Sequence, residues 1–197
     1  MTFTWNYDNS LGAPNCDKKQ KATENLESGL TEKGFEFLSE MEALGIIPDV
    51  SHLSDKGFYD VAKFSKKPFV ASHSNSRSIC SHPRNLTDDM IRIIGNKNGL
   101  IGLNYCNSFL SNKYISGYGI DIEAFLPHIK HIISVGGEDC LALGTDFDGI
   151  ENPPVQISDA SKQQKLVSML EKNGYNENII EKICYKNVLR FYKENLK

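Results

Sequence analysis

The chain has 197 residues, of which 40% are hydrophobic and 24% charged, as is typical of a folded globular protein and not of a disordered one. The net charge is −3 and the basic residues are scattered, so we expect no nucleic-acid-binding surface. No apolar stretch approaches the ~18 residues of a membrane span, and no signal-peptide pattern is visible. From the length of the chain, we expect one domain over residues 1–197.

Short apolar runs alternate with segments of helical periodicity along the chain. The runs predict strands at residues 3–5, 46–50, 68–71, 99–105 and 141–144. Residues 6–28 are polar and predict a long loop. Capping residues and apolar stripes predict helices after Thr31, Ser54 and Thr87, and further helices over 122–135, 158–172 and 176–184.

This alternation indicates an α/β fold. Continuous apolar strands separated by amphipathic helices are typical of a parallel sheet that is covered on both faces. The spacing fits either an open doubly wound sheet or part of a (β/α) barrel. In both architectures, functional residues lie at the carboxyl ends of the strands.

Three chemically useful residues follow three of the predicted strands. His52 comes after the run at 46–50, His73 after the run at 68–71, and Asp146 after the run at 141–144. Adjacent strands lie about 4.8 Å apart, so the two histidines could share one metal ion, with Asp146 facing them. Neutral imidazoles beside carboxylates are typical of hydrolytic zinc sites, in which a carboxylate moves the proton to the leaving group.

Other residues give weaker signals. His128 and His131 lie three apart on a predicted helix, and we expect both to face solvent. Arg84, in a polar loop after the His73 strand, could bind a carboxylate. The five cysteines form no CxxC pair, so we expect reduced thiols in a cytoplasmic protein. Phosphate-loop and nucleophile-elbow motifs are absent from the sequence.

Three long blocks of the sequence are distinctive: GLTEKGFEFLSEMEALGIIPDVSHLSDKGFYDV, KKPFVASHSNSRSICSHPRNLTDD and LALGTDFDGI. They resemble the membrane (renal) dipeptidases, zinc enzymes of the amidohydrolase type, and the resemblance runs from Phe3 to about Tyr192. It implies a (β/α)₈ TIM-type barrel with a two-metal site that hydrolyses dipeptides.

By position, the resemblance also implies roles for individual residues. His52 and His73 correspond to two histidine ligands of one metal, and Asp146 to a catalytic carboxylate that also contacts substrate. Arg84 corresponds to the arginine that holds the substrate's terminal carboxylate. Trp5 stands where some members of the family carry a substrate-contacting histidine.

The resemblance covers only part of the family's barrel. In the family, an early His-x-Asp pair binds the first metal and a later glutamate bridges both metals, and both features lie upstream of the segment that resembles residues 1–5. We therefore expect a partial barrel, strands four to eight without the first three, with two open sheet edges. Such a half-site should hold at most one zinc ion.

Three functions are consistent with the sequence. The first is a metallodipeptidase that is complete only with an N-terminal part. The second is an inert fragment that acts as an assembly partner, as a homo-oligomer or with the missing half. The third is another amidohydrolase-type activity on a small amide. The metal could be zinc, manganese, cobalt or iron, because histidine and carboxylate ligands suit all four.

Overall fold

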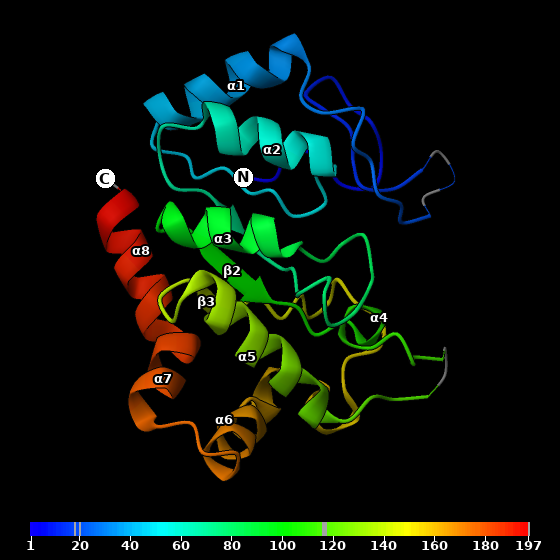
Figure 1. The fold of residues 1–197 in the computed structure, drawn as a ribbon, viewed down its shortest axis with the longest axis vertical. Coiled ribbons are helices and arrows are strands. Elements are labelled where there is room, and N and C mark those ends of the chain that lie inside the picture. The colour runs from blue at the N-terminus through cyan, green and yellow to red at the C-terminus, as the bar shows by residue number, and fades with distance from the viewer. Residues whose placement is uncertain (18, 20, 116–117, 197) are drawn as a thin grey trace.

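A computed structural model describes residues 1–17, 19, 21–115 and 118–196 (Figure 1). Its sheet has three parallel strands in the order β1-β2-β3, namely Val70–Ala71, Leu100–Leu103 and Leu141–Leu143. Val70 pairs with Leu100, and Ile101 pairs with Leu141. The predicted α/β fold with a parallel sheet is confirmed, although each strand is shorter than its apolar run.

Two of the strand predictions are wrong, because residues 3–5 and 46–50 do not form strands in the structure. Within the described residues, this part of the sheet has only single parallel bridges, Thr2 to Asp49 and Asp49 to Val70. Pro48 has no N–H to donate to a ladder. The Asp49 side chain accepts the N–H of Ser51, which turns the chain away after one pair. The first segment nevertheless lies beside the second, and the second beside β1, in chain order.

Helices separate the strands along the chain, and several of them pack against the sheet (Figure 1). The α-helices are α1 (Glu32–Ala43), α2 (Asp55–Phe64), α3 (Asp88–Asn96), α4 (Asn107–Leu110), α5 (Phe125–Gly136), α6 (Gln164–Lys172), α7 (Glu177–Glu181) and α8 (Asn187–Asn195). The short 3₁₀ turns are η1 (Ile122–Ala124), η2 (Val155–Ile157) and η3 (Ala160–Lys162), and η4 (Lys182–Lys186) is a π-helical turn. None of the described helices is long and apolar enough to cross a bilayer.

The helix starts follow the sequence closely. The Thr31, Ser54 and Thr87 side chains accept hydrogen bonds from the N–H groups of Gly34, Gly57 and Met90, which begin α1, α2 and α3 as predicted. Gly45 follows α1 with a φ of +73°, a conformation that glycine adopts without strain. The predicted helix at 158–172 begins later, at Gln164, after the turn η3.

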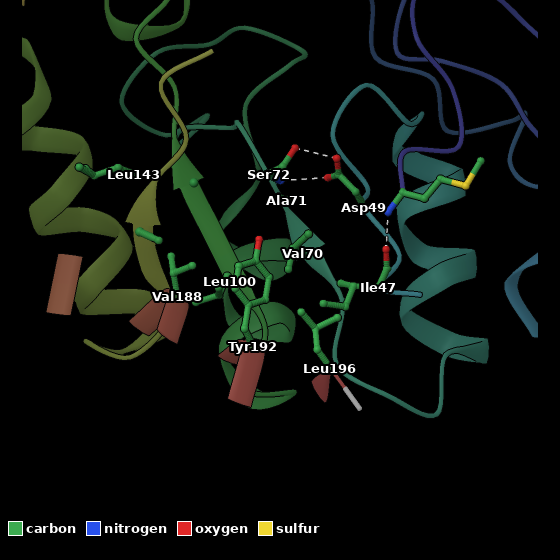
Figure 2. A pocket seen from close by; sticks show the side chains of 13 residues that line it. Ile47, Asp49, Val70, Ala71, Ser72, Leu100, Leu143, Val188, Tyr192 and Leu196 are labelled. Carbon is green, nitrogen blue, oxygen red and sulfur yellow. Dashed lines mark hydrogen bonds between the residues drawn. The ribbon is translucent and has the colours of Figure 1, made fainter. Parts of the chain in front are cut away.

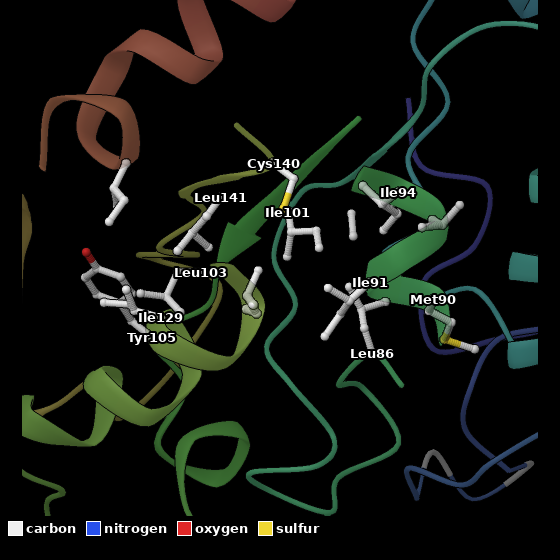
Figure 3. Packing of buried hydrophobic residues seen from close by; sticks show 14 of the residues in the cluster. Leu86, Met90, Ile91, Ile94, Ile101, Leu103, Tyr105, Ile129, Cys140 and Leu141 are labelled. Atoms are coloured by element: carbon white, nitrogen blue, oxygen red, sulfur yellow. The ribbon is translucent and has the colours of Figure 1, made fainter. Parts of the chain in front are cut away.

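The main core lies between the helices and one face of the sheet, which we call the outer face (Figure 3). Strand residues Ile101, Leu103 and Leu141 are fully buried there against Ile91 and Ile94 of α3 and Ile129 of α5. Burial of such side chains contributes roughly 2 kcal/mol each. This packing fixes the position of the strands, and therefore of the loops that leave their carboxyl ends.

The inner face of the sheet is apolar but less fully covered. Leu100 and Ala142 pack with Phe191 of α8, and Val70 and Val188 contact this small cluster. Beside it lies a cavity of about 470 Å³, whose lining includes Met1, Tyr192 and Leu196 (Figure 2). These three side chains are roughly half exposed. The inner face therefore has a free apolar surface next to the C-terminal helix.

Candidate active site

A second cavity, of about 370 Å³, lies at the carboxyl ends of the parallel segments. Three of the residues singled out in the sequence, His52, Arg84 and Asp146, line it together. The other lining residues are Trp5, Asn6, Asn15, Cys16, Ala22, His82, Cys106, Phe109, Gly149 and Ile150. This is the edge of the sheet at which the sequence predicts the chemistry.

The structure brings His52 and His73 together, as expected from their positions. Their ring centroids are 4.9 Å apart, and both follow residues of the parallel sheet. His52 has a φ of +70°, so its backbone turns sharply at the end of its segment. The buried Nε2 atom of His73 has no hydrogen-bond partner within the described part of the chain. A buried nitrogen without a partner is costly, and such an atom requires an explanation.

The hydrogen bonds around His73 fix its tautomer. The Ser72 hydroxyl donates to Asp49 Oδ2 at 2.6 Å, because a carboxylate can only accept (Figure 2). Ser72 Oγ also lies 2.7 Å from His73 Nδ1, and its single proton is already used. The His73 Nδ1–H must therefore donate to Ser72, which leaves an unprotonated lone pair on the buried Nε2 atom.

His52 has a comparable arrangement. Its Nδ1 lies 3.1 Å from Asn6 Oδ1, an acceptor, so the Nδ1–H donates and Nε2 keeps a lone pair. Both imidazoles thus have their proton on the nitrogen that a second residue holds. This is the usual arrangement of histidines that ligate a metal, in which an outer hydrogen bond fixes the ring.

Asp49 organises this part of the site, and the sequence analysis did not identify it. Its Oδ1 accepts the backbone N–H groups of Ser51 and Ser72, and its Oδ2 accepts the hydroxyls of Thr2 and Ser72. The carboxylate therefore joins three neighbouring segments of the sheet. An acidic residue inside the apolar run IIPDV was the available signal.

The electrostatic environment keeps both imidazoles neutral. Burial lowers the pKa of His52 to about 2, and the nearby Arg84 and His73 add to this effect. Burial and Arg84 also lower the pKa of His73, although Asp146 and Asp49 oppose them. Neutral imidazole is the form that ligates metals.

The two Nε2 lone pairs fit a divalent metal of the zinc type, and they account for the unpartnered atom of His73. They form only part of a ligand set. Across the described residues, no group of three or more histidine, cysteine, aspartate and glutamate side chains converges on one point. The five cysteines are free, as expected.

Arg84 is buried at the cavity, with 6% of its surface exposed. Its guanidinium carbon lies 5.5 Å from the centroid of the Phe109 ring. Its Nη2 atom is buried and has no hydrogen-bond partner in the described structure. Burial lowers the pKa of Arg84 to about 10, and Asp49 and Asp146 oppose the change. The group remains a cation at neutral pH with donors available to an anion.

Asp146 lies on the loop after β3, residues 144–154, which we call the carboxylate loop. Its φ is +59°, and its Oδ2 accepts a hydrogen bond of 3.2 Å from Asn104 Nδ2. Gly149 closes the turn by donating its N–H to the Asp146 carbonyl oxygen. Asp146 is only partly buried, in contrast to Arg84.

The expectation that His128 faces solvent is wrong. His128 is completely buried, and its Nδ1 accepts the N–H of Ser76 while its Nε2–H donates to the Leu110 carbonyl oxygen. Burial lowers the pKa of His128 to about 4. His131 is partly exposed and contacts Asp88. Phe125 and Ile132, three residues before and four residues after His128, are on the buried face of α5. This apolar periodicity was the signal that could have predicted the burial of His128.

Comparison with known proteins yields a consistent set of relatives. The membrane dipeptidase family, peptidase family M19, matches residues 1–197. A protein of Klebsiella pneumoniae described as uncharacterized, from the pqqA 5′ region, is 34% identical over 189 residues, which are 96% of this chain and 69% of that protein. An uncharacterized dipeptidase of Schizosaccharomyces pombe is 33% identical over 98% of this chain and 46% of its own length.

Among solved structures, a metallopeptidase from Rhodobacter sphaeroides superimposes with a TM-score of 0.82 and 35% identity. That structure contains a phosphinate mimic of the dipeptide L-Ala-D-Ala. The match covers 93% of this chain and 49% of the Rhodobacter chain, so this chain spans about half the length of that relative.

Proposed function

This chain belongs to the membrane dipeptidase family, and we propose that it carries one part of the active site of a metal-dependent dipeptidase. The observation that carries the proposal is the buried, unpartnered Nε2 atom of His73 beside the ring of His52. Two lone pairs fixed by outer hydrogen bonds in this way are typical of histidines that ligate a metal. In this proposal residues 1–197 form a single domain, which carries all four proposed site residues, His52, His73, Arg84 and Asp146.

The proposed roles follow from the geometry of each side chain. His52 and His73 hold one metal ion, for which zinc suits the nitrogen ligands. When bound, zinc polarises a carbonyl and lowers the pKa of water to about 7. Arg84 orients the substrate by pairing its free guanidinium donors with the terminal carboxylate of a dipeptide.

Asp146 is proposed as the group that moves the proton. Its carboxylate lines the same cavity as Arg84 and His52, so a dipeptide held by Arg84 lies within its reach. The carboxylate accepts a proton from the attacking water and returns it to the leaving amine nitrogen. Hydrolysis of the peptide bond then gives two free amino acids.

We further propose that turnover requires the segment that the longer relatives carry outside the matched region. The two imidazoles hold at most one metal, whereas a two-metal clamp divides water activation and carbonyl polarisation between its ions. The loss of one ion should raise the barrier by several kcal/mol, which is a loss of several decades in rate. The half-exposed apolar face beside Met1, Tyr192 and Leu196 supports this proposal, because such a segment could cover it.

The same apolar face supports the alternative function, an assembly role without catalysis, in which a second copy covers it. Activity measurements separate the two. Purified chain should not hydrolyse alanyl-alanine appreciably in the presence of zinc. Co-expression with the N-terminal segment of the Rhodobacter relative should restore hydrolysis, and Asp146→Asn should abolish the restored activity. Turnover near 10 s⁻¹ by the chain alone, which is about the median for enzymes, would contradict the half-site.

Zinc titration tests the metal ligands directly. Calorimetry should show at most one site per chain, and His52→Ala should remove it. A stoichiometry of two zinc ions, or an undiminished signal in that variant, would refute the ligand assignment.

A further inference from the structure

Arg77 forms a forked ion pair with Asp55, the first residue of α2. Its Nη1 donates to Asp55 Oδ2 and its Nη2 to Asp55 Oδ1, both at 2.8 Å. The two side chains are 11% and 5% exposed. A buried ion pair is weak evidence for added stability, because removal of two charges from water offsets most of their attraction. Its location is therefore more informative than its strength.

Arg77 Nη1 also donates to Glu24 Oε1 at 3.3 Å, and the other donors of Arg77 bind the backbone on both sides of Arg84. Arg77 Nε donates to the carbonyl oxygen of Asn85 and Nη2 donates to that of Pro83, both at 2.9 Å. Asn15 Nδ2 adds a third hydrogen bond, to the same Pro83 oxygen at 3.1 Å. Arg84 thus lies between two carbonyl groups that one guanidinium holds.

The side chain of Arg84 has few attachments of its own. Its Nη2 atom is buried without a partner in the described structure, and the guanidinium rests on the Phe109 ring. The direction of that guanidinium is therefore set by the backbone that carries it. That backbone is tied through Arg77 to α2, a helix that Ser54 caps.

We propose that Arg77 and Asp55 are a positioning pair for Arg84, which rests on the proposed function of Arg84 as the binder of the substrate's carboxylate. The pair fixes the Pro83–Asn85 backbone to α2, and so aims a guanidinium whose Nη2 has no hydrogen bond of its own in the described structure. Geometry of this precision matters because small displacements of a binding group cost large factors in rate.

The conservative variant Arg77→Lys tests the pair. Lysine keeps the positive charge, but its single ammonium cannot reproduce the planar fork that reaches both Asp55 oxygens and both carbonyls. The matched control is Arg92→Lys, in another arginine–aspartate pair, Arg92–Asp89, whose side chains are 55% and 59% exposed. Thermal unfolding of both variants should first show that they fold.

Amide hydrogen exchange provides a measurement that does not depend on substrate. The N–H groups of Arg84 and Asn85 are bonded to His82. In Arg77→Lys they should exchange at least about tenfold faster than in the original chain, while the amides of β2 keep their rates. The control Arg92→Lys should leave both sets unchanged. Equal exchange at Arg84 and Asn85 in the original chain and in Arg77→Lys would overturn the positioning pair.

Binding of alanyl-alanine and of its C-terminal amide, followed by NMR in the presence of zinc, provides the second readout. The original chain should bind the acid about tenfold or more tightly than the amide, and Arg77→Lys should bring this ratio close to one. A preserved ratio in Arg77→Lys would overturn the positioning role, whatever the exchange data. If the original chain does not distinguish acid from amide, the proposed role of Arg84 fails, and the exchange rates alone decide whether the pair holds the loop.

Discussion

Two of the loops that contribute to the candidate site differ in how firmly they are held. The first, residues 72–86, carries His73 and Arg84, and we call it the arginine loop. Its buried residues include Asn75, Asn85 and Leu86. The second is the carboxylate loop, residues 144–154, which carries Asp146 and is mostly partly buried or exposed.

The arginine loop is fixed by side-chain amides as well as by Arg77. Asn85 Nδ2 donates to the carbonyl oxygens of Cys80 and Phe109, and its Oδ1 accepts the N–H of Asn75. Asn75 in turn exchanges two hydrogen bonds with the backbone of Asn104. Within the described residues, the Asp146 side chain accepts a single hydrogen bond, from Asn104. The binding groups are thus preorganised, whereas the proposed proton-transfer group is less firmly held.

The largest expected contrast is in zinc binding. His73→Ala removes a proposed ligand from the arginine loop and should weaken zinc binding by more than about 100-fold. Asp146→Ala, on the carboxylate loop, should change the affinity by no more than about threefold. Calorimetric titration of both variants measures the contrast, and equal losses would show that the carboxylate loop shares in metal binding.

Stability should differ between the loops in the same direction. Asn85→Ala leaves the buried N–H of Asn75 without its acceptor and removes one of two hydrogen bonds from each of the Cys80 and Phe109 carbonyl oxygens, so it should lower the free energy of unfolding by about 2–4 kcal/mol. Asp146→Ala should lower it by less than about 1 kcal/mol. Urea unfolding provides both values. A small effect of Asn85→Ala would mean that water replaces these hydrogen bonds.

Acid should loosen the arginine loop through His128, which accepts the N–H of Ser76. Because burial lowers the pKa of His128 from 6.5 to about 4, the unfolded chain binds the proton first as the pH falls. The stabilisation is present above pH 6.5 and is lost between pH 6.5 and about 4. It is on the order of 3 kcal/mol.

The variant His128→Leu should be less stable at pH 7 and should reduce the slope of stability against pH in this window. His131→Asn, at the partly exposed histidine on the same helix, is the control and should keep the slope. Urea unfolding at several pH values tests both. An unchanged slope in His128→Leu would assign the acid sensitivity to three partly buried histidines, His52, His73 and His82.

The smallest expected effect is at Gly149, in the carboxylate loop. A Cβ at this position would lie 2.3 Å from Asp146 Oδ1, so Gly149→Ala must displace the carboxylate. Since a side-chain end can move, the free energy of unfolding should fall by less than about 1 kcal/mol. The restored activity of the two-part enzyme should nevertheless fall about tenfold, because Asp146 is misplaced. Unchanged activity would show that the carboxylate needs no fixed position.

The sequence predicts well whatever depends on neighbouring residues. The helix starts at Thr31, Ser54 and Thr87 could be predicted because a cap acts within three residues. The points at which the chain leaves the sheet could be predicted to within about two residues, because a change from apolar to polar residues follows each parallel segment, and this placed His52, His73 and Asp146 at one edge of the sheet.

Features that depend on distant residues could not be predicted from local patterns. The short strands at 70–71 and 141–143 reflect pairing with neighbours, which β-propensity does not determine. Apart from Ser51, the partners of the Asp49 carboxylate lie 23 or more residues away, and Asp55 lies 22 residues from Arg77, so neither role has a local signature. The pairing of Arg77 with Asp55 becomes visible only when the loop folds back onto α2.

The hydrogen bonds of Asp49 have a consequence for the order of assembly during synthesis. The groups that donate hydrogen bonds to the Asp49 carboxylate belong to Thr2, Ser51 and Ser72, and His73 directly follows Ser72 in the chain. The hydrogen bonds that hold the two imidazoles, including those of Thr2 and Asn6, therefore all lie within residues 2–73 and can form before the ribosome has added Asp146. If these imidazoles hold the proposed metal, a nascent chain that ends near residue 99 should already retain zinc.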